Sequence, residues 1–124
     1  LPRAIRDVYK RQVGTYSQAV KVDKTVYISG QIGLDPNTMT LADGFVNQAN
    51  QVMSNIDAIC QAAGGSLANV VKFNVSLTDL ADFTALNEIF AARLTAPYPA
   101  RAAVQVAALP KGAVVEIEAI LVLD

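Results

Sequence analysis

Residues 97–119 read PYPARAAVQVAALPKGAVVEIEA, and the alternation in this stretch decides the fold. Small and β-branched residues dominate positions 101–107, and a Leu-Pro-Lys-Gly sequence typical of turns follows at 109–112. From 114 to 123 apolar residues alternate with glutamates. The pattern predicts two strands joined by a short connection.

Alternation of side chains along these strands places Arg101 on the same face as Glu116 and Glu118, among otherwise apolar neighbours. This polar face has two interpretations that spacing alone leaves equally open. The charges can be purely structural, either as a buried ion pair, since buried charges must be paired, or as charges at the rim of the sheet. Alternatively, the planar guanidinium of Arg101 can bind a substrate carboxylate through two parallel hydrogen bonds, which leaves a glutamate free for proton transfer.

The length of 124 residues fits one domain, and the composition indicates a protein that associates with itself. Hydrophobic residues make up 52% of the chain and charged residues only 17%, so we expect part of the apolar surface to face another subunit. The sequence contains neither an apolar run long enough to span a membrane nor a secretory signal pattern. We therefore expect a soluble, cytoplasmic protein without a membrane partner.

The chain has no histidine and one cysteine, Cys60, which limits the chemistry available to it. The usual zinc sites and the usual Ser-His and Cys-His nucleophile pairs are excluded, and so is an intrachain disulfide. Cys60 falls on the apolar stripe of a predicted helix, where a small buried hydrophobe is a better interpretation than a reactive thiol. We expect neither metal nor cofactor, so any hydrolysis must use water, a carboxylate and an arginine.

Charge is distributed unevenly along the chain. Four of the ten basic residues lie within the first twelve positions, which leaves six basic against ten acidic residues from Val13 onward. Lysine and arginine contacts to phosphates supply most of the affinity for nucleic acids. The acidic body of the chain therefore disfavours a nucleic acid as the main partner.

The basic start of the chain, LPRAIRDVYKRQ at residues 1–12, has charges between its apolar residues and neither a helical nor a strand period. We interpret it as an irregular N-terminal arm, and its origin, foreign to the domain or native to it, stays open. The domain itself is predicted to span residues 13–124.

The rest of the chain alternates between strand and helix patterns. The predicted elements are, in order, a hairpin over 17–22 and 25–29, a helix over 45–63, a strand over 71–77, and a helix that starts after Thr78 or Asp79 and ends before Pro97. Val71 belongs to the expected core face of the strand, and Leu80, Phe83 and Phe90 belong to that of the second helix. With the two C-terminal strands the order is ββ-α-β-α-ββ, which predicts an α+β fold with a single mixed sheet and both helices on one face.

An ordered set of motifs covers nearly the whole domain: GTYSQA at 14–19, YISGQI at 27–32, VK at 71–72, LTDLADF at 77–83, Asn87, YPAR at 98–101, LP at 109–110 and VEIEA at 115–119. The set resembles the reactive-intermediate deaminase (Rid, YjgF) family, and Arg101 favours its arginine-containing branch. One departure is Thr15, which stands where the family usually has proline.

This resemblance implies a chorismate-mutase-like α+β subunit in a homotrimer, with ligand sites in the clefts between subunits. It also implies hydrolysis of reactive 2-imino acids, such as 2-iminopropanoate and 2-iminobutanoate, to 2-oxo acids and ammonia. By position, Arg101 matches the family arginine that binds the substrate carboxylate, and Glu116 matches the glutamate that positions or activates the attacking water. The residues expected to line the pocket are Tyr16, Ser29, Gly30, Asn87 and, through its backbone amide, Ala103.

This chemistry agrees with the residues available, because a protonated imine is already electrophilic and its hydrolysis needs only orientation and one proton acceptor. Two other functions stay open. The same cleft can serve a 2-oxo acid-binding or protein-interaction module without turnover. An endoribonuclease activity, found in some relatives, is disfavoured by the missing histidine and the acidic body.

Overall fold

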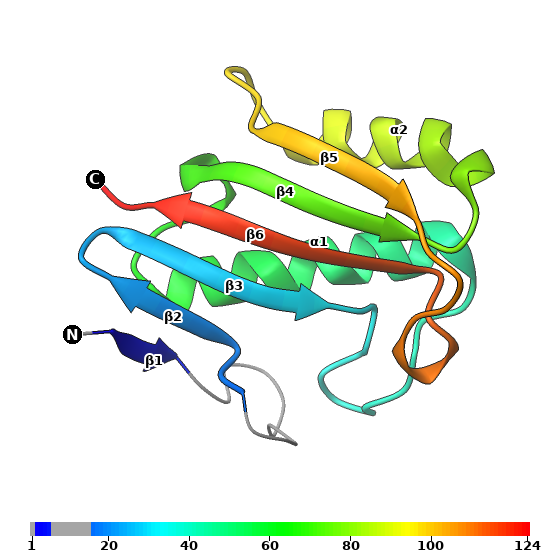
Figure 1. Ribbon diagram of the computed structural model, residues 1–124, viewed down its shortest axis with the longest axis horizontal. Coiled ribbons are helices and arrows are strands. Elements are labelled where there is room, and N and C mark those ends of the chain that lie inside the picture. The colour runs from blue at the N-terminus through cyan, green and yellow to red at the C-terminus, as the bar shows by residue number, and fades with distance from the viewer. Residues whose placement is uncertain (1, 6–15) are drawn as a thin grey trace.

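The computed structural model describes residues 2–5 and 16–124, which form a six-stranded sheet with two helices behind it (Figure 1). The strands are β1 (Arg3–Ile5), β2 (Ala19–Val22), β3 (Thr25–Gln31), β4 (Val70–Leu77), β5 (Ala100–Gln105) and β6 (Val115–Val122). The helices are α1 (Gly44–Ala62) and α2 (Phe83–Arg93), with short 3-10 turns η1 (Leu67–Asn69), η2 (Leu80–Asp82) and η3 (Pro110–Gly112). The spatial order is β1-β2-β3-β6-β4-β5, in which β4 and β5 run parallel and the other described pairs antiparallel. The predicted α+β class and mixed sheet are confirmed.

Both helices pack against the same face of the sheet, as the sequence predicts (Figure 1). α1 supplies much of the core through apolar side chains at helical spacing, all fully buried: Ala49, Val52, Met53, Ile56, Ile59 and Cys60. α2 adds Leu86 and Phe90, whose ring lies 5.1 Å from that of Phe73 in β4. No helix in the described part of the chain is long and apolar enough to cross a membrane.

Cys60 lies inside this core as a buried hydrophobe, which confirms the interpretation from its position on the helix. Burial, and to a smaller extent the negative charge of Asp57, raise the pKa of its thiol to about 12. A thiol with so high a pKa stays protonated at neutral pH, so Cys60 is not a nucleophile.

The N-terminal residues that the structure describes take part in the sheet. Arg3–Ile5 forms β1, which pairs antiparallel with β2, and Ile5 packs against the core. For these residues the expectation of an irregular arm is wrong, because the free edge of β2 offers unpaired backbone groups that even a short segment can bind. The remainder of the predicted arm lies outside the described residues, and the domain boundary at residue 13 stays a prediction.

Two residues expected in the core are exposed instead. A shift of register near the start of β4 buries Val70 and leaves Val71 47% exposed, because a bulge adds one residue to the strand. Leu80 lies in η2 rather than in α2 and is 46% exposed. Asp79 begins this turn, and its carboxylate accepts a hydrogen bond of 2.8 Å from the amide of Ala81.

The two C-terminal strands are not neighbours, because β4 lies between β5 and β6. In β4, Phe73 pairs with Arg101 of β5, and Ser76 pairs with Glu116 of β6. Phe73 is fully buried under the helices, whereas Ser76, an odd number of positions further on, faces the open side of the sheet. Arg101 therefore lies on the helix-covered face and Glu116 and Glu118 lie on the open face, so the prediction of one shared polar face is wrong.

The environment of β5 explains this arrangement. β5 is an edge strand, and α2 covers it with an asparagine and two phenylalanine rings that can accommodate a charge. On the same strand Val104 faces the open side and is 54% exposed. The strand sequence ARAAVQ consists mostly of small residues, so it has no strong alternation that would define which side faces the helices.

Gly33, in the loop that leads from β3 to α1, lies against the helix backbone. A Cβ at this position would be 2.7 Å from both the Cα and the carbonyl oxygen of Gln48. We expect Gly33→Ala to lower the free energy of unfolding by about 1 to 3 kcal/mol, because the added methyl must push rigid backbone apart. Urea or thermal unfolding measures the loss.

Gly30→Ala is the matched control, because there the added Cβ would meet only the flexible end of the Glu116 side chain. It should therefore cost much less stability than Gly33→Ala. Equal losses in the two variants would show that the close backbone contact at Gly33 is not what makes the glycine necessary.

Candidate active site

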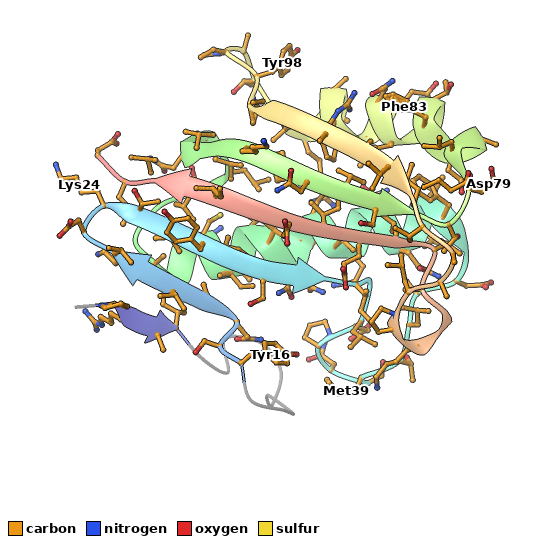
Figure 2. The ribbon with its side chains drawn as sticks, in the orientation of Figure 1. Tyr16, Lys24, Met39, Asp79, Phe83 and Tyr98 are labelled. Atoms are coloured by element: carbon orange, nitrogen blue, oxygen red, sulfur yellow. The ribbon has the colours of Figure 1, made fainter. Side chains whose placement is uncertain are left out.

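A hollow of about 470 Å³ opens between α2, β5 and the loop that joins them. Figure 2 shows Phe83 on α2 and Tyr98 on the loop that precedes β5. The wall is largely apolar, and Arg101 is its one charged member among the described residues that line it: Phe73, Asn87, Phe90, Ala91, Leu94, Tyr98, Pro99 and Arg101. An apolar hollow with one fixed cation suits a small organic anion.

Three side chains of α2 hold the guanidinium of Arg101. Its Nη1 donates a hydrogen bond of 2.7 Å to Oδ1 of Asn87, and its central carbon lies 4.9 Å from the ring centroid of Phe83 and 5.5 Å from that of Phe90. These partners are neutral, and no acidic side chain among the described residues pairs with Arg101. Within one chain the ion pair with the glutamates is therefore excluded, and the positive charge is available to a ligand.

Glu116 lies on the open face, next to a bulge in β3. The pairing of β3 with β6 shifts register around Ser29 and Gly30, which is typical of a β-bulge. Gly30 leaves space for the glutamate, because a Cβ there would lie 2.8 Å from Cδ of Glu116. Ser29 donates a hydrogen bond of 2.6 Å to the carbonyl oxygen of Ser17, which ties the segment that follows Tyr16 to the bulge.

The carboxyl group of Glu116 is a better proton acceptor than that of a fully exposed glutamate. Burial raises its pKa above the usual range, and the charge of Glu118 on the same face raises it further. Glu118 accepts a hydrogen bond of 3.0 Å from Asn74, whereas Glu116 accepts none from the residues that the structure describes. A half-buried carboxylate with a raised pKa is a stronger base than an exposed one, which suits it to accept a proton during catalysis.

The residues expected at the site form two groups on the two faces of the sheet. The group around the β3 bulge consists of Tyr16, Ser29, Gly30 and Glu116. The group beside α2 consists of Asn87, Arg101 and Ala103, whose side chain packs against the core. Figure 2 shows Tyr16 at the β2 side of the sheet, far from Phe83 and Tyr98 at the β5 side. A single chain does not bring Arg101 and Glu116 into one cavity.

Comparison with known proteins identifies the family. Residues 9–123 match the profile of the family described as Endoribonuclease L-PSP, which contains the YjgF/RidA proteins. The chain belongs to the YjgF/RidA family.

Similar YjgF/RidA proteins include named deaminases. A goat (Capra hircus) protein named 2-iminobutanoate/2-iminopropanoate deaminase is 53% identical over 111 residues, which cover 89% of this chain and 81% of the goat protein. The human (Homo sapiens) protein of the same name is 51% identical over an alignment of the same length. The crystal structure of RidA from the Antarctic bacterium Psychrobacter sp. PAMC 21119 matches with a TM-score of 0.94 and 68% identity, and the match covers 98% of this chain and 99% of that chain.

The sequence of this YjgF/RidA chain identifies the charged residues but not the aromatic contacts of Arg101. It predicts Phe83 and Phe90 as core residues and gives no reason to place them against a guanidinium. A signal is nonetheless present, because Phe83, Asn87 and Phe90 have the i, i+4, i+7 spacing of one helix side. Only the tertiary packing of α2 over β5 shows that this side meets Arg101.

Glu118→Gln should lower the pKa of Glu116, because the substitution removes the neighbouring negative charge and keeps the shape of the side chain. The pKa should stay above the usual range, since burial, the larger cause, remains. NMR titration of the isotope-labelled Glu116 carboxyl measures the change. Glu88→Gln on α2 is the control for an exposed glutamate elsewhere. An unchanged pKa in Glu118→Gln would show that Glu118 does not influence Glu116.

Proposed function

We propose that the protein hydrolyses 2-imino acids, such as 2-iminopropanoate and 2-iminobutanoate, to 2-oxo acids and ammonia. The observation that carries this proposal is a pair of opposite charges without charged partners of opposite sign: in the described part of the chain, Arg101 has no acidic partner and Glu116 accepts no hydrogen bond. The names of relatives that share about half of their aligned residues with this chain support the same reaction. We place the reaction in the cytoplasm, where unpaired cysteines such as Cys60 are usual.

Arg101 binds the substrate carboxylate in this proposal. One N–H of its Nη1 is bonded to Asn87, and the other N–H groups of the planar guanidinium can donate two parallel hydrogen bonds to one carboxylate. The apolar wall of the hollow is suited to the short alkyl group of the substrate. Binding therefore fixes the position of the imine carbon relative to the protein.

Glu116 accepts a proton as the water oxygen attacks C2 of the protonated imine, which gives a tetrahedral carbinolamine. The carboxyl group then returns this proton to the nitrogen, and the C–N bond breaks as the C=O bond forms. Ammonia leaves with the hydroxyl proton as ammonium, so one water is consumed for each imine. The protonated imine is already electrophilic, so orientation and one proton acceptor are sufficient.

We propose that the two groups meet across the subunit interfaces of a homotrimer. Tyr27 and Val104 are 50% and 54% exposed on the open face, and Val104 pairs with the same β4 residue as Glu116. A second copy that covers this face removes apolar surface from water, and it can bring the Arg101 of one copy to the Glu116 of the next. Because the contact uses two different surfaces, it does not build a two-fold dimer, and in the proposed trimer the rotation between copies closes the ring after three.

Substitutions of the two charged residues should have different effects. Arg101→Lys keeps the charge but loses the planar fork, so binding of 2-oxobutanoate and turnover should both weaken. Glu116→Gln keeps the shape but loses the proton acceptor, so kcat should fall by about a hundredfold while 2-oxobutanoate binding survives. An amino-acid oxidase can supply the imine, whose disappearance measures turnover. A wild-type protein that binds 2-oxobutanoate without accelerating imine loss would be a binding module, and the proposal would be wrong.

Mixtures of the two variants test whether one site uses residues of two copies. In trimers assembled at random from equal amounts of Arg101→Lys and Glu116→Gln chains, about a quarter of the interfaces combine an intact arginine with an intact glutamate. Co-refolded mixtures should recover about that share of wild-type activity, although each variant alone is nearly inactive. No recovery in mixtures that light scattering shows to be trimeric would place both residues of a site in one chain. A wild-type protein that scatters as a stable monomer would contradict the trimer.

A further inference from the structure

Asn87 is the polar neighbour of Arg101 and lies on the same side of α2 as the two aromatic contacts. Its Oδ1 accepts the hydrogen bond of 2.7 Å from Nη1, and the rings of Phe83 and Phe90 lie 4.9 Å and 5.5 Å from the central carbon of the guanidinium. Arg101 is thus held at one N–H group and over two rings. A long side chain in an otherwise exposed position is fixed before any ligand arrives.

Fixing the arginine in advance favours binding, because the conformational entropy of its side chain is lost on folding rather than when the substrate binds. The chemical nature of residue 87 then matters. An aspartate of the same size would hold the guanidinium more strongly, but it would neutralise the charge and compete for the same donors as a substrate carboxylate. An asparagine holds the group and leaves the charge in place.

The N–H donors of Arg101 that Asn87 does not use remain available to a ligand. A guanidinium carries five N–H donors in one plane. Asn87 uses one of those on Nη1, and Arg101 makes no other side-chain hydrogen bond to the residues that the structure describes. Donors on Nη2 and Nε therefore stay available as a parallel pair, which is the geometry that a carboxylate accepts.

We propose that Asn87, together with Phe83 and Phe90, is a positioning residue that orients Arg101 for the substrate carboxylate and preserves its charge. It acts through Arg101 and does not touch the reacting atoms. Asn87 thus has a role beyond lining the pocket. This inference rests on the proposed function, since it requires that Arg101 binds a carboxylate.

Asn87→Asp is the decisive variant. Its melting temperature should stay unchanged or rise, because a charge-assisted hydrogen bond replaces a neutral one. The Kd for 2-oxobutanoate and the KM for the imine should nevertheless rise by about tenfold or more, while kcat changes by less than about threefold. A merely structural role does not predict weaker binding by a protein that is equally or more stable.

Asn87→Ala removes the hydrogen bond without adding a charge, and the exposed helical position tolerates alanine. Its Kd and KM should rise less than those of Asn87→Asp, by about threefold to tenfold, as expected for the loss of one hydrogen bond to a charged group. The matched control is Asn50→Asp, because Oδ1 of Asn50 accepts a hydrogen bond of 3.1 Å from Nε of Arg93 at the α1–α2 contact. This asparagine–arginine pair lies outside the proposed site, so Asn50→Asp should leave Kd and KM unchanged.

A double-mutant cycle separates this inference from the proposed function. If Asn87 acts through Arg101, Asn87→Asp should weaken binding little further in an Arg101→Lys background. Full additivity, a wild-type Kd in Asn87→Asp, or a fall in kcat without a rise in KM would each overturn the positioning role. Failure of both Asn87 variants to fold would also overturn it, because the contact would then serve stability. Unchanged 2-oxobutanoate binding in Arg101→Lys alone would instead refute the proposed function.

Discussion

The position of β4 between β5 and β6 is the constraint on which the rest of the structure depends. Phe73 and Ser76 are three positions apart in β4, an odd step, so the residues that pair with them must lie on opposite faces of the sheet. Arg101 is thereby covered by α2 and held by neutral partners, whereas Glu116 is half buried on the open face with a second carboxylate beside it. One sheet thus carries two complementary charged groups that do not neutralise each other within the chain.

The sequence predicts the elements well where one face of an element is strongly apolar. α1 and β6 have long runs at helical or strand spacing, so local periodicity and burial agree. The sequence does not predict the structure where the pairing between strands determines it. The bulge that exposes Val71 depends on the register with β6, and β1 depends on the free edge of β2, and neither can be seen in a local pattern.

In the candidate site, too, some features can be predicted from the sequence and others cannot. Residue type and the family motifs identify Arg101 and Glu116, because in a chain without histidine few types of side chain can bind a carboxylate or accept a proton. Their separation onto two faces follows from a crossover connection, since strands adjacent in sequence need not be adjacent in space. The sequence of β5 does not show which of its sides faces the helices. Its side chains are mostly small, and Val104 is as apolar as a core residue and yet is exposed. The prediction of Phe90 as a core residue describes only one of its two contacts, since its ring packs on Phe73 and also lies against the guanidinium of Arg101.

Each half of the proposed site is supported by regular structure rather than by long loops. Arg101 is fixed by a strand and by one side of a helix, and Glu116 is fixed by a central strand next to a glycine that leaves room for its carboxylate. Side chains supported in this way keep their own orientation well. If two copies supply the halves, the distance between acid and cation depends on how the open face of one copy packs against the next. The apolar residues of that face then contribute to catalysis by setting this distance, although none of them needs to touch the substrate.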